Sequence, residues 1–162
     1  MQPARTQDIV LVNQTITQNT TTPLINMAQA WQGITFIVSI TTVSGTSPTF
    51  DVYVQRLLPS AASTDVAPFP PTGAFVPDDL LHFTQMTTTA NRVINLVSAS
   101  ATGTANAEVI TTADYTISNA ALTAANSRIC PVGDNFQVKV VVGGTSPSAF
   151  VSLVARLYPV GS

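Results

Sequence analysis

Residues 34–43 read Ile-Thr-Phe-Ile-Val-Ser-Ile-Thr-Thr-Val, and this stretch decides the fold class. Apolar side chains recur at every second position from Ile34 to Ile40. A period of two places them on one face of a β-strand, because successive side chains of a strand point to opposite faces. The stretch therefore predicts a strand with one face in a core.

The alternation is interrupted at residues 44–48, Ser-Gly-Thr-Ser-Pro, and resumes over residues 50–54. Glycine permits positive φ and proline removes a donor from the ladder, so this segment is typical of a turn. We therefore expect an antiparallel hairpin, with 34–43 and 50–54 as its strands. Three side chains of the second strand belong to the face opposite the core: Asp51, Tyr53 and Gln55.

The same pattern returns about a hundred residues later. Residues 136–142 alternate, Gly-Gly-Thr-Ser-Pro follows at 143–147, and residues 150–158 resume the strand. Arg56-Leu-Leu-Pro is matched by Arg156-Leu-Tyr-Pro. This spacing predicts two equivalent hairpins, either one in each sheet of a sandwich or side by side in one sheet.

The middle of the chain is less regular. Residues 59–79 contain five prolines, which exclude a helix or a central strand and favour a loop or an interaction arm. Shorter strands are expected at 80–86 and 91–98, and weaker ones at 108–112 and 115–117. With the β-run Ile9-Val-Leu-Val12, this makes about seven to nine strands.

The pattern as a whole predicts an all-β, antiparallel β-sandwich with 7–9 strands, with the jelly roll as its expected form; other Greek-key sandwiches share this pattern. We expect two parts, an N-terminal strand or arm at residues 1–22 and a sandwich domain at 23–162 that carries the Pro-rich loop 59–79. The Cys…Trp…Cys spacing of immunoglobulin domains is absent.

Composition excludes several functional classes. Of the 162 residues 45% are hydrophobic and only 9% charged, and the net charge is -2, whereas about 25% charged is usual. Six scattered cations do not provide the basic patch that nucleic-acid binding requires. We expect no membrane partner, because the apolar runs are too short to span one and no secretory signal is visible. We therefore expect the protein to be made in a cytoplasm.

The sequence offers little for catalysis or metal binding. His82 is the one histidine, and a catalytic interpretation would pair it with Asp78 or Asp79. No Gly-x-Ser-x-Gly or phosphate-binding motif accompanies it, so we interpret it as a polar residue on a half-exposed strand. Cys130 is single, which excludes an intrachain disulfide and Cys-based zinc sites. We predict no enzymatic activity, no metal and no cofactor.

Two features could serve binding. Trp31 and the tyrosines at 53, 115 and 158 could be stacking platforms for a glycan, or they could cover the ends of the core. Arg56 and Arg156 occupy equivalent places in the two repeats. They could form ion pairs with a partner chain, or lie along the sheet edge with their heads in water.

The run from Gly33 to Gln55 resembles a hairpin of small tailed-bacteriophage virion proteins, in which an aliphatic strand, a Gly-Thr-Ser-Pro turn and a Val-rich strand follow one another. Those proteins carry a second hairpin near the C-terminus, similar to residues 136–154. The resemblance covers roughly a third of the chain. It implies a sandwich or jelly-roll protein of the capsid decoration, or cement, type, which binds as an oligomer across joints of the major capsid protein.

We accordingly expect a non-enzymatic protein of the capsid exterior, which stabilises a phage head and associates with itself as a homodimer or homotrimer. A glycan-binding module of a virion fibre or neck and a tail or connector component remain as alternatives. The residues expected to contact partners are Ile9, Val10, Leu11, Val12, Phe69, Phe75, Arg56 and Arg156.

Overall fold

The computed structural model describes residues 6–26, 31–59, 75–97, 100–102, 111–113, 124, 126–128 and 135–159. Within these ranges the protein is built from strands and contains no helix, so the all-β prediction is confirmed. None of the described segments is a helix that could cross a membrane.

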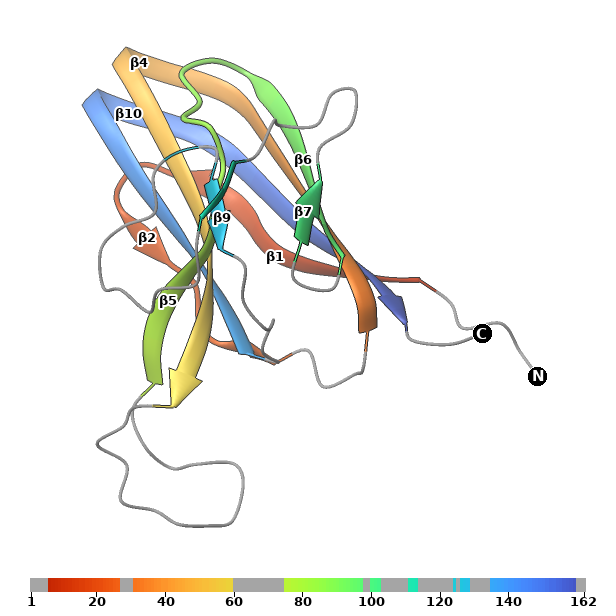
Figure 1. The fold of residues 1–162 in the computed structure, drawn as a ribbon. Helices are drawn as coiled ribbons and strands as arrows, with labels where there is room; N and C mark the ends of the chain where they lie inside the picture. The colour runs from red at the N-terminus through yellow and green to blue at the C-terminus, as the bar shows by residue number, and fades with distance from the viewer. Residues whose placement is uncertain are drawn as a thin grey trace.

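All described strands belong to one open sheet, which is antiparallel except for its pairing of β8 with β9 (Figure 1). Its main path runs β1-β10-β4-β5-β9-β8. The strands are β1 (Gln7–Ile16), β2 (Thr20–Thr21), β3 (Ile25–Asn26), β4 (Trp31–Pro59), β5 (Phe75–His82), β6 (Ala90–Val97), β7 (Ser100–Thr102), β8 (Thr111–Ala113), β9 (Asn126–Arg128) and β10 (Asn135–Pro159).

The two expected hairpins do not form. β4 and β10 run through their Gly-Thr-Ser-Pro segments as single strands of 29 and 25 residues. They pair antiparallel with each other over nearly their whole length. The two segments are therefore bends that lie side by side in one sheet, with Thr46 opposite Thr145. Positive φ at Gly45 (113°) and Gly144 (94°) bends each strand instead of reversing it.

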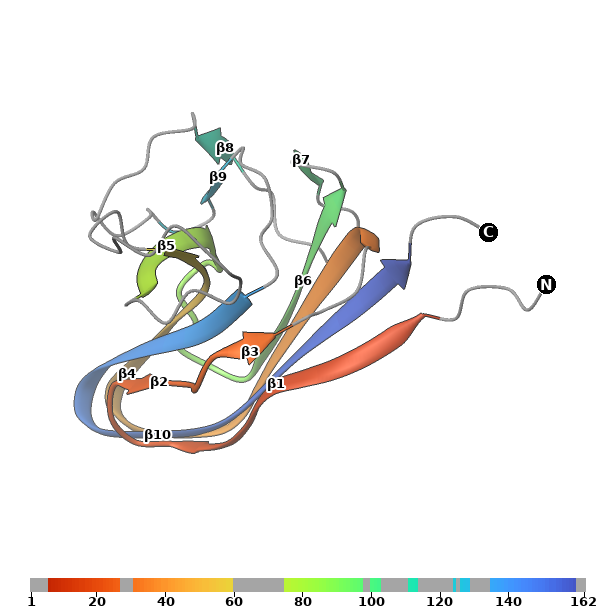
Figure 2. The same cartoon turned by 90° about the horizontal axis from the view of Figure 1, so that it is seen from below.

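The bends fold the sheet into two limbs that face each other, as Figure 2 shows from below. Strands β1 to β3 follow the length of β10, and β5 and β6 follow the length of β4. We call residues 42–48 and 144–148 the corner. The first limb comprises residues 7–16, 149–159, 31–41 and 90–97. The second limb comprises residues 20–26, 135–143, 49–59 and 75–86.

The core fills the space between the limbs and contains the side chains that the period of two assigns to it. Ile34, Phe36, Val38 and Ile40 are each 0–1% exposed, which confirms the predicted buried face. Phe36 from the first limb meets Phe136 from the second edge to face, with ring centroids 6.4 Å apart. Apolar burial between the limbs is the main force that keeps the sheet folded on itself.

The repeat in the sequence corresponds to an approximate two-fold relation within the sheet. β5 pairs with the C-terminal half of β4, with Asp78 opposite Arg56. β1 pairs with the C-terminal half of β10, with Asp8 opposite Arg156. Each pairing then contains a register shift, at Leu80 in β5 and at Leu11 in β1.

The shorter predicted strands are found with shifted bounds. β5 begins inside the expected loop 59–79, so the loop prediction is wrong for residues 75–79. Pro77 is tolerated there because the other residues of β5 supply the ladder bonds to β4. Part of the strand expected at 108–112 is β8. Residues 60–74, 115–117 and Cys130 lie outside the described ranges.

Candidate interaction surface

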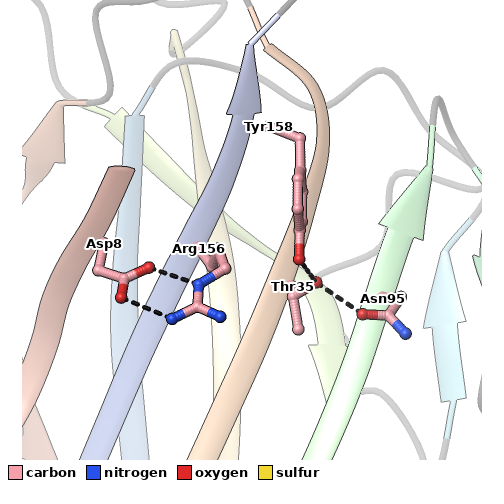
Figure 3. Close-up of polar contacts among 5 residues, drawn as sticks. All are labelled: Asp8, Thr35, Asn95, Arg156 and Tyr158. Atoms are coloured by element: carbon pink, nitrogen blue, oxygen red, sulfur yellow. Dashed lines mark hydrogen bonds and ion pairs between the residues drawn. The ribbon is translucent and has the colours of Figure 1, made fainter. Parts of the chain in front are cut away.

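A row of polar side chains crosses four strands on the side of the first limb that points away from the core (Figure 3). Asp8 on β1 accepts two hydrogen bonds from Arg156 on β10, at 2.7 Å from Nε and 2.8 Å from Nη2. Thr35 on β4 donates to Asn95 on β6 at 2.6 Å. The Tyr158 hydroxyl lies 3.3 Å from the Thr35 hydroxyl.

An apolar row lies next to this polar row. Strand register places Val10, Val154, Ile37 and Val93 beside one another on β1, β10, β4 and β6. Val10 is 60% exposed and the other three are half-buried. A third row is polar again and consists of Asn13, Ser152, Ser39 and Asn91. We call these three rows, with Tyr158, the outer face.

The outer face is electrically neutral in its described part. Its charged residues are Asp8 and Arg156, which neutralise each other. The hydrogen bond from Arg156 holds the pKa of the Asp8 carboxyl below its usual value, with a smaller coulombic contribution from the same guanidinium. The face therefore presents amides, hydroxyls and aliphatic groups, with no excess of either charge.

The predicted contact residues of β1 divide between the core and the surface. Leu11 and Val12 are 6% and 4% exposed and belong to the core, while Ile9 packs against it. Only Val10 points to the outer face. Leu11 and Val12 therefore offer little side-chain surface to a partner in the folded chain. β1 is part of the folded sheet, and it contributes a third core residue, Ile16.

β1 is nevertheless an edge of the sheet. In the described part of the chain β10 is the one strand that pairs with it. An open hollow of about 330 Å³ lies at this edge between β1 and the segment that contains β2 and β3. It is lined by residues of both, among them Val10, Gln14 and Ile25. Leu24, in the same segment, is 43% exposed.

Each of the two arginines forms an ion pair with a carboxylate of its own chain. Arg56 donates from Nε to Asp78 at 2.8 Å, and its Nη2 lies 2.7 Å from the same oxygen. Both side chains are at most 3% exposed. Arg156 makes the equivalent pair with Asp8 on the surface, at 44% and 48% exposed. Phe75 is the first residue of β5, and Phe69 lies outside the described ranges.

A second polar cluster occupies the side of the second limb opposite the core, where Asp51 and Tyr53 were expected to lie. His82 on β5 is 4% exposed, so the half-exposed strand position expected for it is wrong. Its Nε2 lies 3.1 Å from Asp51 Oδ1, and its ring stacks on Tyr53 at 3.8 Å. Lys139 Nζ lies 5.0 Å above the Tyr53 ring. The catalytic interpretation of the sequence paired His82 with Asp78 or Asp79, whereas the carboxylate described here beside its ring belongs to Asp51 on the neighbouring strand β4.

Gln55 continues this cluster across three strands. Its Nε2 donates to Asp79 on β5 at 2.6 Å, and its Oε1 accepts from Gln137 on β10 at 2.7 Å. Gln55 and Asp79 are 6% and 5% exposed. Hydrogen bonds of this kind satisfy buried polar groups and fix the register of β5, β4 and β10.

The pKa of Tyr53 in this cluster is shifted in the direction expected for a buried tyrosine. Burial raises the pKa of the Tyr53 hydroxyl, and the carboxylates of Asp51 and Asp79 raise it further. Within the described residues no group of three or more His, Cys, Asp or Glu side chains could hold a metal ion. These contacts assign the cluster a role in joining β5, β4 and β10.

The aromatic residues do not gather into one described platform. Tyr53 is buried at 8% exposed, while Tyr158 is 40% exposed on the other limb. Tyr115 and the Trp31 side chain lie outside what the structure describes. Comparison with known proteins adds no further guide, because no family model, curated protein or solved structure matches the chain.

Proposed function

We propose that this chain is a non-enzymatic structural protein of a virion, of the capsid decoration or cement type, that binds the major capsid protein from outside. The observation that carries the proposal is the outer face. It offers a four-stranded surface with an apolar row between two polar rows that carry no net charge. Such a surface suits contact with another protein, since protein interfaces combine a partly apolar centre with hydrogen-bonding groups.

The use of charge in the chain supports the same proposal. Three of its few cationic or basic side chains, Arg56, Arg156 and His82, contact carboxylates of the same chain. When most charged side chains are paired within the chain, the protein attracts charged partners only weakly at long range. A permanent contact with another protein, repeated in many copies, therefore suits it better than binding to nucleic acid. Bound copies would stabilise an assembled shell by mass action.

The finer fold assignment belongs to this proposal. We propose that the two limbs act as the two layers of a β-sandwich of the jelly-roll kind, although they derive from one bent sheet. The buried contact of Phe36 with Phe136 supports it, because it joins opposite limbs across the core. Self-association as a homodimer or homotrimer is also part of the proposal.

The test is co-sedimentation with shells of a tailed phage that encodes this chain, prepared without it. Ser39→Lys places a cation in the third row of the outer face, next to the apolar row, and Thr88→Lys makes the same charge change at an exposed site outside the face. We expect saturable binding in hundreds of copies for the wild type and Thr88→Lys, and at least about tenfold weaker binding for Ser39→Lys. Absence of wild-type binding would remove the capsid proposal, and binding in a handful of copies would favour a tail or connector.

A glycan-binding function is the second candidate, and Tyr158 is the observation that favours it. Its exposed ring lies beside Thr35, whose hydroxyl is bonded to Asn95, and carbohydrate sites combine an aromatic ring with such polar groups. Intrinsic fluorescence titrated with polysaccharides tests this candidate. A saturable change that Tyr158→Ala abolishes would support it, whereas no change with any polysaccharide would remove it.

A further inference from the structure

We propose that the free edge of β1 pairs antiparallel with β1 of a second copy of this chain, around a two-fold axis. The inference rests on the self-association in the proposed function, and it specifies a dimer that forms through the edge of β1. It does not depend on which particle the protein joins.

Lysine and proline, two of the features that normally prevent such pairing, are absent from this edge, and its one irregularity is the register shift at Leu11. β1 has ten residues, none of them lysine or proline. Native sheets protect exposed edges with these residues, with charges or with very short strands, because free N–H and C=O groups recruit other strands. The charge on β1 is Asp8, and Arg156 neutralises it. Two β1 strands can therefore approach each other without charge repulsion.

The internal two-fold relation compares this edge of β1, which no described strand occupies, with the same edge of its counterpart β5. β5, the counterpart of β1, pairs with β4 on one side and with β9 on the other, through Leu81 and His82. β1 pairs with β10 on one side, and no described strand of the chain occupies the other. A strand from outside would give β1 the environment that β5 already has.

A second copy fits this position better than an unrelated strand. In an antiparallel pair around a two-fold axis each β1 supplies the same donors and acceptors that it needs, so one surface is complementary to itself. The exposed apolar side chains at this edge, Val10 and Leu24, are 60% and 43% exposed in the single chain. They flank the hollow of about 330 Å³, which a neighbouring copy could fill.

The test combines molar mass with hydrogen exchange on the full chain. We expect light scattering after gel filtration to give twice the 17.0 kDa chain mass. In an antiparallel pair, alternate residues of β1 direct their N–H groups away from β10. Those alternate amides should be protected at high protein concentration and exchange freely on dilution.

Two variants with the same charge change make the test specific. Gln14→Lys lies on the exposed part of β1, and Asn91→Lys lies on β6 of the same limb, also exposed. We expect Gln14→Lys to weaken the dimer about tenfold or more, since a lysine on an edge strand opposes pairing with another strand. Asn91→Lys should leave it intact.

A monomeric wild type at high concentration, or an unaltered Gln14→Lys dimer, would overturn the inference. A trimer without concentration-dependent protection of β1 would do the same. These outcomes leave the co-sedimentation result unaffected, so a failure of the edge pairing is distinguishable from a failure of the capsid proposal.

Discussion

Gly144 at the corner should not tolerate even one added methyl group. Its φ is +94°, where an L-residue brings its Cβ against the backbone. A Cβ built there would lie 2.5 Å from the Ser47 carbonyl oxygen and 2.7 Å from that of Thr46. Both oxygens belong to β4, so they can move only if the two central strands separate at the bend.

The expected loss of stability in Gly144→Ala follows from three contributions. The left-handed backbone costs about 1–2 kcal/mol with a Cβ, and overpacking against backbone atoms adds about 1–3 kcal/mol. The lower conformational entropy of alanine in the unfolded chain offsets about 0.4–1 kcal/mol. The free energy of unfolding should therefore fall by about 3 kcal/mol, a large part of a typical total of about 5–15 kcal/mol.

Gly143→Ala is the matched control. Its Cβ would meet the Thr49 hydroxyl at 2.5 Å, but that atom belongs to a side chain that can rotate away. We expect a change of less than about 1 kcal/mol. Urea unfolding followed by circular dichroism measures both, and the 3 kcal/mol loss corresponds to a midpoint lower by about 1.5 M if m is near 2 kcal/mol/M. Equal losses in the two variants, or a loss below about 1 kcal/mol in Gly144→Ala, would refute the reasoning.

Two further predictions concern the polar pairs. Asp78→Asn removes the charge that pairs with the buried Arg56 guanidinium and should lower the free energy of unfolding by about 3–5 kcal/mol. Asp8→Asn breaks the equivalent exposed pair and should shift the urea midpoint far less, so equal shifts in the two variants would contradict the assignment. The raised pKa of Tyr53 means that its neutral form stabilises the fold below the unfolded value near 10 and that this contribution is lost as pH rises through the higher folded pKa. Tyrosinate absorbance should therefore show one late-titrating group that Tyr53→Phe removes, and its persistence in that variant would contradict the prediction.

The strand pattern was predictable, but the path of the chain through the corner was not. Alternation from Ile34 to Ile40 identifies the buried face correctly because side-chain period is a local property. Whether a Gly-Thr-Ser-Pro segment reverses a strand or bends it depends on which strand lies beside it. Here Thr46 pairs with Thr145, ninety-nine positions away, and no local signal carries that information.

The polar sites were predictable to a similar extent. The polar face of β4 was correct at Asp51 and Tyr53, but the partnership of Asp51 with His82 required the register of β4 against β5. The two arginines were correctly placed as equivalents. Their local sequences are nearly the same, and yet Arg56 is buried while Arg156 is exposed, because burial is decided by the tertiary surroundings.

The approximate two-fold relation also makes the topology close to a ring. β10 ends beside the start of β1, with Leu157 opposite Gln7. A short connector between these two ends would therefore close the chain into a ring. A circular permutant that starts at Trp31 would preserve every strand pairing. The same geometry brings the start of β1 and the end of β10 out at one tip of the first limb, far along the strands from the corner. A peptide fused beyond either end would be displayed from that tip and would leave the corner uncovered.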